Sequence, residues 1–405
     1  MKILIINAQW TGSSTGKIAY GFYKRLVESG HEVILAHHMG EKNQEDEHVI
    51  RFSPTIEPKI HFRYNLITGY HGTFGPIANH NIKRIVEEFK PDIVQLYNLH
   101  GYGMDIFRFM DFLAKKDIPT VYGMLDEYPY LGYCCYAYDC HQFETGCKDC
   151  HLDFKDRYMK SYFFNRARKT LLMKEKNYNS FRKIVFTGPE WVVERAKKSY
   201  LLQDKDVREV DEYIDTENTF IIRDTAQLRK ELGISEDKVI LLDVAPSTDT
   251  RKGVEYFIKL ARLFENDNRF AFINVGYGNN FKELPSNFIG IPYVKSQEKL
   301  AEYYSLADLF VCTSMADTMP NTCLDALACG TPVCGFDITG VPYVAEYPLG
   351  RFVEAGNVNE LQKIVQNISK KTELLKQECR SYAESRYSLD TYYRKQMEIY
   401  KELVE

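Results

Sequence analysis

The stretch from residue 316 to residue 333 contains two aspartates whose placement could serve chemistry. Its sequence, ADTMPNTCLDALACGTPV, is typical of a loop, a helix, a glycine stop and a strand. Pro320 suits the first helical turn, and Gly330 suits the end of the helix. Asp317 precedes the helix, where its carboxylate can offset exposed amides. Asp325 lies inside the helix, so the two acids are separated by seven residues.

Asp325 is the residue that a purely structural helix explains least well. An acid inside an otherwise apolar helix costs desolvation energy unless it meets hydrogen-bond donors. The paired hydroxyls of a ribose are suitable donors. The backbone amides of Asn321 and Thr322, at the N-terminus of the same helix, are placed to receive a diphosphate. The pattern predicts a nucleotide-diphosphate site, and a structural helix is the alternative.

A basic pair and a glycine-containing loop are further candidates for binding phosphate. Arg251 and Lys252 follow a strand-like run, and fixed cations can stabilise a departing diphosphate without a metal. Gly16 lies in the run GSSTGK at 12–17, where glycines permit close backbone approach and helix amides can hold an anion. This run has neither the Walker spacing nor the dinucleotide spacing. A solvated basic turn and a plain connecting turn are the alternatives.

His100 and Asp126 follow two strand-like runs, at 93–96 and 120–122. Ligands of α/β proteins bind at the carboxyl ends of strands, so both residues are candidates for hydrogen bonding to a ligand. A histidine buried in the core is the alternative interpretation of His100.

Five cysteines lie between residues 134 and 150, and four of them have spacing that suits a metal site. Cys147 and Cys150 have the C-x2-C spacing of many structural zinc sites, and Cys134 and Cys140 could supply the other two thiolates. His141 and His151 are adjacent. Reduced thiols or a redox pair are the alternative, and nothing in the pattern provides the open position and base of a catalytic metal.

These motifs resemble those of the family 4 retaining glycosyltransferases, in particular the subgroup that makes colanic acid and capsular polysaccharide. The family has two acids at the spacing of Asp317 and Asp325, followed by an Ala-Cys-Gly-Thr-Pro-Val exit. Three positions depart from the family pattern. Asp325 stands where glutamate is usual, Tyr97 replaces a histidine, and Leu125 occupies the position of a histidine that contacts the donor sugar.

The resemblance implies a metal-independent hexosyltransferase that retains configuration and transfers a sugar from a nucleotide-diphosphate sugar to a glycan or lipid-linked oligosaccharide. Together with the motifs, it predicts these catalytic residues: His100, Asp126, Arg251, Lys252 and Asp317. It predicts this donor-binding set: Gly16, Arg251, Lys252, Asp317, Pro320, Asn321, Thr322 and Asp325. No cofactor is expected for catalysis, and Cys134, Cys140, Cys147 and Cys150 are expected to hold a structural zinc ion. The alternatives are a sugar-nucleotide 2-epimerase and a binding or scaffold protein that has lost the chemistry.

The elements that must position these residues follow a β-α-β rhythm along the whole chain. Short apolar runs alternate with amphipathic segments, which favours parallel sheets covered by helices. The 405 residues suit two domains. We expect an α/β protein of the GT-B type, with two tandem Rossmann-like, doubly wound domains and a cleft between them. The predicted divisions are an acceptor-side domain at 1–182 with a cysteine-rich insert at 134–151, a donor domain at 183–385, and a helix at 386–405 that returns to the first domain.

Charge and hydropathy limit the partners. The net charge of −4 and the pI near 6.2 give no global attraction to nucleic acid. No run approaches the roughly 20 apolar residues of a membrane-spanning helix, and the first apolar run is too short for a signal peptide, so a cytoplasmic location is expected. Residues 155–183 contain ten basic and two acidic residues among aromatics. This stretch could dock peripherally on the inner membrane face, and a solvated helix is the alternative.

Overall fold

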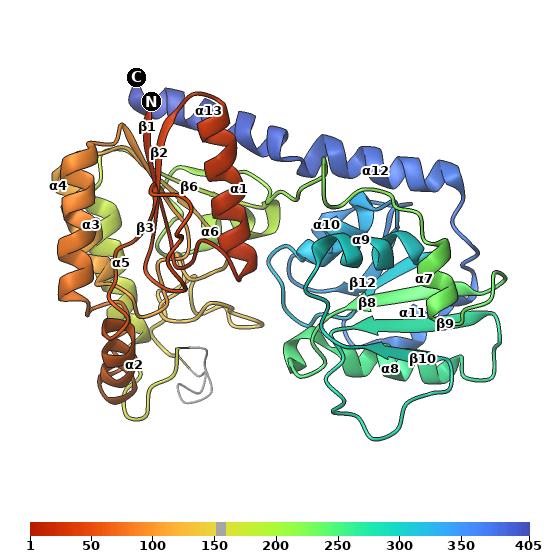
Figure 1. Cartoon of the computed structure of the whole chain (residues 1–405). Coiled ribbons are helices and arrows are strands. Elements are labelled where there is room, and N and C mark those ends of the chain that lie inside the picture. Colours follow the sequence, from red (N-terminus) through yellow and green to blue (C-terminus); the bar gives the residue numbers. More distant parts are fainter. Residues whose placement is uncertain (151–158) are drawn as a thin grey trace. The chain divides into compact units, whose positions relative to one another are not determined.

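The computed structural model describes residues 1–150 and 159–405, which form two compact units (Figure 1). Unit 1 consists of residues 1–212 and 392–405, and unit 2 consists of residues 213–391. Each unit contains one parallel β-sheet covered by helices, so the chain has two Rossmann-like domains in tandem, as the β-α-β rhythm predicts.

The sheet of unit 1 has seven strands in the order β3-β2-β1-β4-β5-β6-β7, and every neighbouring pair is parallel. Its strands are β1 (Lys2–Asn7), β2 (Glu32–His37), β3 (Val49–Arg51), β4 (Ile93–Leu96), β5 (Thr120–Gly123), β6 (Ile184–Gly188) and β7 (Val207–Glu209). β1 lies between β2 and β4, and its residues Ile3 to Ile6 are fully buried. A strand that is buried on both faces explains the continuous apolar run at the N-terminus.

Helices cover both faces of this sheet, with α3, α4 and α5 on one side and α1 and α6 on the other (Figure 1). The helices of unit 1 are α1 (Ser14–Glu28), α2 (Glu57–Thr68), α3 (Pro76–Phe89), α4 (Ile106–Lys115), α5 (Ala167–Ser180), α6 (Glu190–Lys198) and the greater part of α13 (Leu389–Val404). The side chains of Ser13 and Asp105 accept hydrogen bonds from backbone amides at the starts of α1 and α4, which fixes where these two helices begin.

The sheet of unit 2 has six parallel strands in the order β10-β9-β8-β11-β12-β13. Its strands are β8 (Val239–Val244), β9 (Phe270–Val275), β10 (Phe288–Ile291), β11 (Leu309–Cys312), β12 (Val333–Asp337) and β13 (Gly350–Glu354). Its helices are α7 (Ala226–Glu231), η1 (Thr250–Lys252), α8 (Val254–Leu263), α9 (Gln297–Leu306), α10 (Asn321–Ala328), η2 (Pro342–Val344), α11 (Val358–Gln366) and α12 (Glu373–Tyr387).

Alternation along β8 divides the core of unit 2 into two layers. Ile240 and Leu242 pack in the layer that contains residues of α9, α10 and α12. Val239 and Leu241 face the opposite layer, with residues of α8 and α11. Both faces of the sheet are therefore covered, as a doubly wound fold requires.

The predicted boundary at residue 182/183 differs from the division in the structure. The apolar run at 184–188 does not begin a second sheet, because β6 pairs with β5 through Thr120 and Ile184, and β7 pairs with β6. Unit 1 therefore continues to Glu212. A buried apolar run does not indicate which sheet its strand joins, so the sequence predicts a domain boundary that comes too early.

The C-terminal helices also differ in detail from the predicted helix at 386–405. α12 ends at Tyr387 and α13 begins at Leu389, so the first of the predicted residues belong to unit 2. Residues 392–405 belong to unit 1, where the Tyr392 ring packs edge-on against Phe22 at 5.0 Å between centroids. Tyr400 donates a hydrogen bond to the side chain of Gln95, also in unit 1.

Among the described residues of the basic aromatic stretch at 155–183, Ala167–Ser180 form helix α5. The first residues of the stretch, including Lys155 and Tyr158, lie outside the described part of the chain, as does His151. Residues 159–166 are not helical, because the Leu66 carbonyl accepts the amide of Tyr162 and Asn65 donates to the Lys160 carbonyl, which ties the segment to α2. Among the described helices, none is long and apolar enough to cross a membrane.

Candidate functional site

The basic pair of unit 2 lies against the first aspartate of the 316–333 stretch. Lys252 Nζ lies 2.5 Å from Asp317 Oδ2, and Arg251 Nη1 lies 3.6 Å from the same oxygen. Arg251 also donates to the Ala316 carbonyl at 2.7 Å and pairs with Asp249. The structure thus brings together three of the predicted catalytic residues. Asp317 pairs with both cations, and this differs from the predicted role of offsetting helix amides.

Two glycines allow the loops that carry this group to approach each other closely. Gly253 follows η1 with a φ of +66°, and a Cβ there would lie 2.0 Å from the Thr313 carbonyl oxygen. A Cβ on Gly340 would lie 1.7 Å from the carbonyl oxygen of Thr318. The amide of Gly340 donates to the Asp317 carbonyl, and the Asp317 amide donates to Thr339 Oγ1. Neither position can carry a side chain without moving the loop that holds Asp317.

The helix that follows this loop is α10, as predicted, and it begins at Asn321. Pro320 is the buried N-cap residue, one position before the first turn where the sequence placed it. Asn321 and Thr322 are half-buried in the first turn, whose amides have no acceptor within the helix. Asp325 lies one turn further on, in the buried part of the helix. Burial and the Asp325 carboxylate raise the pKa of Tyr304 well above its usual range, which places this ring close to the acid.

Charge in this group is balanced within unit 2. Burial acts to lower the pKa of Lys252, but the Asp317 carboxylate outweighs it and holds the pKa above its ordinary value. Lys252 therefore stays a cation at neutral pH. Sequence reasoning missed Asp243, the buried acid near the end of β8, whose pKa burial raises well above its usual range. It accepts a hydrogen bond from Asn274 Nδ2 at 2.7 Å, and its position at a strand end was the available signal.

Gly16, the remaining predicted donor residue, belongs to unit 1. It lies buried in the first turn of α1, where its amide donates to the Ser13 side chain. A Cβ at this position would lie 3.0 Å from the Thr11 amide nitrogen and 3.1 Å from the Trp10 carbonyl carbon. Close packing of the loop on the helix explains a glycine here.

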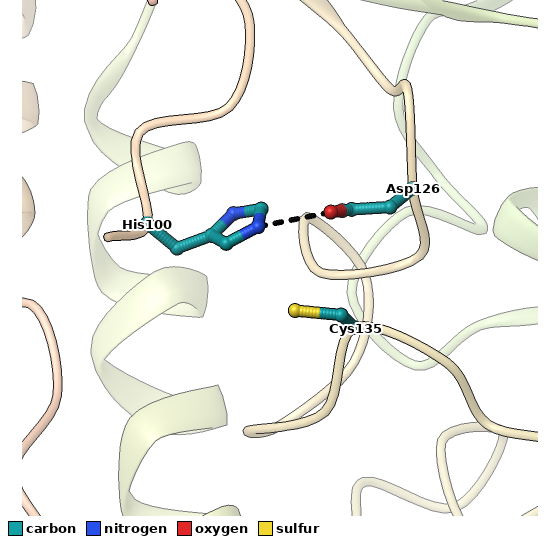
Figure 2. A group of neighbouring side chains, drawn as sticks. All are labelled: His100, Asp126 and Cys135. Atoms are coloured by element: carbon teal, nitrogen blue, oxygen red, sulfur yellow. Dashed lines mark ion pairs between the residues drawn. The ribbon is translucent and has the colours of Figure 1, made fainter. Parts of the chain in front are cut away.

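His100 and Asp126 meet at the carboxyl ends of β4 and β5. His100 Nε2 lies 3.0 Å from Asp126 Oδ2, and Figure 2 shows the two side chains pointing toward each other with the sulfur of Cys135 beside them. Asp126 also accepts from the Tyr128 amide at 2.9 Å and from Asn98 Nδ2 at 3.3 Å. The structure therefore joins two residues that the sequence could only assign separately to strand ends.

The two other departures from the family pattern have different surroundings. The hydroxyl of Tyr97 is buried and lies 2.6 Å from the hydroxyl of Tyr392, so this side chain ties β4 to α13. Leu125 is half-buried beside Asp126. An apolar side chain at this position cannot donate a hydrogen bond to a sugar.

A cluster of buried histidines around His100 was not found by sequence reasoning. Burial lowers the pKa of His38 to about 3 and that of His61 to about 4, and it lowers the pKa of His71 well below its usual range. Together with His100, these rings come from four separate segments. The ring of His71 packs on the ring of Tyr128, with 5.8 Å between their centroids. All three histidines are neutral at physiological pH. No local motif links them, since only the fold brings them together.

The four predicted zinc ligands line one pocket in unit 1. Cys134, Cys140, Cys147 and Cys150 contribute to it together with Leu131, Gly132, Tyr133, Ala137, Gln142, Phe143 and Ala167. Burial raises the pKa of the Cys147 thiol, with smaller contributions from Cys150 and Cys140. Among the described residues, one group of His, Cys, Asp or Glu has all its ligand atoms within 4.8 Å of one another. It is His100, Asp126 and Cys135, and it contains none of the four predicted ligands.

Most of unit 2 is similar to a known protein family. Residues 224–386 match the family Glycosyl transferases group 1. The match contains Arg251, Lys252, Asp317 and α10, the elements that form the group described above.

Two relatives of known activity match shorter stretches. N-acetyl-alpha-D-glucosaminyl L-malate synthase of Bacillus anthracis is 27% identical over 161 residues, 38% of this chain and 42% of the relative. Alpha-galactosylglucosyldiacylglycerol synthase of Streptococcus pneumoniae is 31% identical over 121 residues, 27% of this chain and 32% of the relative. The matches span less than half the length of these relatives.

Solved structures share the fold over the whole chain. Sucrose-phosphate synthase from Thermosynechococcus elongatus has a TM-score of 0.70 and 14% identity, with 99% of this chain and 98% of that chain covered. Anabaena Alr3699/HepE, solved in complex with UDP and glucose, has a TM-score of 0.65 and 14% identity, with 98% of each chain covered. The chain therefore has the GT-B fold of these proteins, as the sequence predicts.

Proposed function

We propose that the protein transfers a hexose from a nucleotide-diphosphate sugar, with retention of configuration and without a catalytic metal, to a glycan or lipid-linked acceptor in surface-polysaccharide synthesis. The observation that carries the proposal is the group of Arg251, Lys252 and Asp317 beside the N-terminus of α10, within the stretch that matches glycosyl transferases. The description of HepE in complex with UDP and glucose supports a nucleotide-sugar donor.

The chemistry follows from where charge develops. When the bond between the anomeric carbon and the donor phosphate breaks, the departing diphosphate gains negative charge. Two cations held in place by Asp249, Ala316 and Asp317 can stabilise that charge without reorganising. The first-turn amides of α10 can donate hydrogen bonds to the phosphate, and the Asp325 carboxylate can accept hydrogen bonds from the ribose hydroxyls. A divalent cation is not needed for this balance.

In unit 1, His100 and Asp126 would contact the acceptor. The contact between His100 Nε2 and the Asp126 carboxylate holds the imidazole in one orientation beside the acceptor. The resemblance implies a histidine at position 125 that forms a hydrogen bond to the donor sugar. Leu125 cannot form this bond, so the transferred sugar would lack it.

The test combines binding and turnover. A thermal-shift screen with nucleotide-diphosphate sugars should give a stabilised complex with one donor, because a ligand that binds only the folded state raises stability by mass action. Turnover should persist in chelator and fall in Arg251→Ala, with Arg262→Ala as the matched control on the exposed end of α8. No shift with any donor would favour a scaffold. Conversion of the donor without an acceptor would identify a 2-epimerase.

We also propose that unit 1 contacts the cytoplasmic membrane surface through part of the 155–183 stretch. Tyr162, Phe163 and Phe164 are 51%, 65% and 46% exposed, and the guanidinium of Arg166 lies 4.6 Å from the Phe164 ring centroid. Aromatic rings beside cations suit an interface with anionic lipid. Phe163→Ser should reduce sedimentation with phosphatidylglycerol vesicles, and Leu284→Ser, an exposed position in unit 2, should not. Equal binding by both variants would contradict the proposal.

The four cysteines at 134, 140, 147 and 150 are proposed to hold a structural zinc ion. They line one pocket, and four thiolates satisfy tetrahedral zinc, so that binding would draw their sulfur atoms together. Bound zinc would close the loop between β5 and α5 and would stabilise unit 1 without entering the reaction. Purified protein should contain zinc that chelation removes with a fall in melting temperature, and metal-free protein of the same stability would contradict this.

A further inference from the structure

A second group of metal-binding atoms lies in unit 1, apart from the four cysteines. The Nε2 of His100, a carboxylate oxygen of Asp126 and the Sγ of Cys135 all lie within 4.8 Å of one another (Figure 2). All three residues are buried, with exposed fractions of 8%, 6% and 4%. Buried polar groups of this kind need partners that compensate for lost water.

The distances suit a small tetrahedral cation. Atoms that share a zinc ion lie roughly 3.3–3.8 Å apart, given Zn–N and Zn–O bonds of about 2.0–2.2 Å and Zn–S bonds of about 2.3 Å. The imidazole and carboxylate atoms are already 3.0 Å apart. In Figure 2 the sulfur of Cys135 points into the space beside this pair. Small side-chain movements would therefore bring all three atoms to one ion.

The surroundings hold two of the three ligands in place. Asp126 is fixed by the amide of Tyr128 and the side chain of Asn98. The ring of His100 packs on Tyr128 at 4.7 Å between centroids. Such outer contacts orient metal ligands and set their affinity.

Proton and charge balance can be satisfied by groups at the site. The Nδ1 of His100 is buried without a hydrogen-bond partner among the described residues. When Nε2 bonds a metal, the ring proton moves to Nδ1, and the contact between Nε2 and the Asp126 carboxylate is replaced by bonds from both atoms to the ion. The thiol of Cys135 releases one proton, and the carboxylate and thiolate together offset a divalent charge. Burial raises the pKa of the Cys135 thiol well above its usual range, and the nearby Lys174, held by the carbonyls of Tyr128 and Leu131, offsets only part of this rise.

We propose that His100, Asp126 and Cys135 form a binding site for a thiophilic divalent cation of the zinc class, and an ion bound there would compete with the acceptor contact proposed for His100 and Asp126. Imidazole, carboxylate and thiolate in one group select such a cation over magnesium or calcium, which prefer oxygen ligands alone. This site is separate from the four-cysteine pocket, so the chain would hold two ions.

The test uses Co²⁺ as a spectroscopic substitute for Zn²⁺ in the full chain. A cysteine ligand gives an absorption band from sulfur-to-cobalt charge transfer, and metal content gives the stoichiometry. Wild-type protein should bind one more ion than Cys135→Ser. Cys150→Ser, which alters the four-cysteine pocket, should keep the site at Cys135 and is the matched control.

A second variant controls for misfolding of Cys135→Ser. Asp126→Asn keeps the size of the side chain and should weaken Zn²⁺ binding at least tenfold while circular dichroism stays unchanged. Equal stoichiometry and affinity in wild-type, Cys135→Ser and Asp126→Asn would overturn the proposal. The readout is the metal itself, so the result does not depend on whether the protein transfers a sugar.

Discussion

Units 1 and 2 both place polar side chains at the carboxyl ends of parallel strands, but the two groups are built differently. In unit 2 the group is charged and partly exposed, with the cations of Arg251 and Lys252 paired to the carboxylates of Asp249 and Asp317. In unit 1 the group is buried, and neutral histidines surround the pair of His100 and Asp126. Fixed charge suits a diphosphate, whereas a buried neutral surface suits hydroxyl groups.

Buried charge in unit 1 serves stability, and its removal should have the largest effect. Glu127 is 1% exposed, and its carboxylate lies 3.0 Å from Arg195 and accepts the amide of Ala137. Glu127→Ala leaves Arg195 and that amide without their partner, which should cost about 3–5 kcal/mol of unfolding free energy. Chemical denaturation measures this.

The control for that change is Glu88→Ala, which breaks an exposed pair with Arg84 in α3 and should cost less than about 1 kcal/mol. If both variants lost the same small amount of unfolding free energy, the buried charge of Glu127 would not stabilise unit 1.

Charge in unit 2 should serve turnover instead. Lys252→Ala removes a cation from the leaving-group side, and we expect kcat to fall about 10²–10³-fold. Steady-state kinetics measures the loss, with Lys259→Ala of α8 as the control. Normal kcat in Lys252→Ala would contradict the assignment of catalytic charge to unit 2.

The buried histidines predict a pH dependence of stability for unit 1. Burial lowers the pKa of His61 from 6.5 to about 4 in the folded state, so the unfolded state binds more protons between these values. Stability should fall as pH decreases from about 6.5 toward 4, by up to about 3 kcal/mol for this residue. Protonation at Nε2 would also break the bond from the Gly72 amide.

His61→Gln should flatten this dependence, because the glutamine amide does not titrate. Exposed His80→Gln is the control. Melting temperatures across that pH range measure the slope, and an unchanged slope in His61→Gln would show that His61 does not carry the effect.

The smallest effect is expected at Tyr97. Tyr97→Phe removes the hydrogen bond to Tyr392 and should cost about 1 kcal/mol, with turnover unchanged. A loss of turnover at unchanged stability would mean that this position still contacts substrate.

The same contrast explains how much the sequence could predict. The strand-like run predicted at 93–96 coincides with β4, and the run at 120–122 coincides with β5 except for its last residue, because both strands are buried in the sheet. The unit 2 group was predicted because its residues lie in two short motifs. The histidine cluster was not, since His38, His61 and His71 come from separate segments that only the folded chain joins. The predicted boundary between the two domains comes too early, because nothing in the sequence of β6 shows which of the two sheets this strand joins.

The most direct test of the central claim is the affinity for nucleoside diphosphates, measured by calorimetric titration of wild-type protein, Asp325→Ala and the exposed control Asp337→Ala. We expect one nucleoside diphosphate to bind wild-type protein and Asp337→Ala equally. Asp325→Ala should bind it about ten- to hundredfold more weakly, through the loss of charged hydrogen bonds to ribose. Equal affinity in all three proteins, or no binding by any of them, would contradict a donor site at α10.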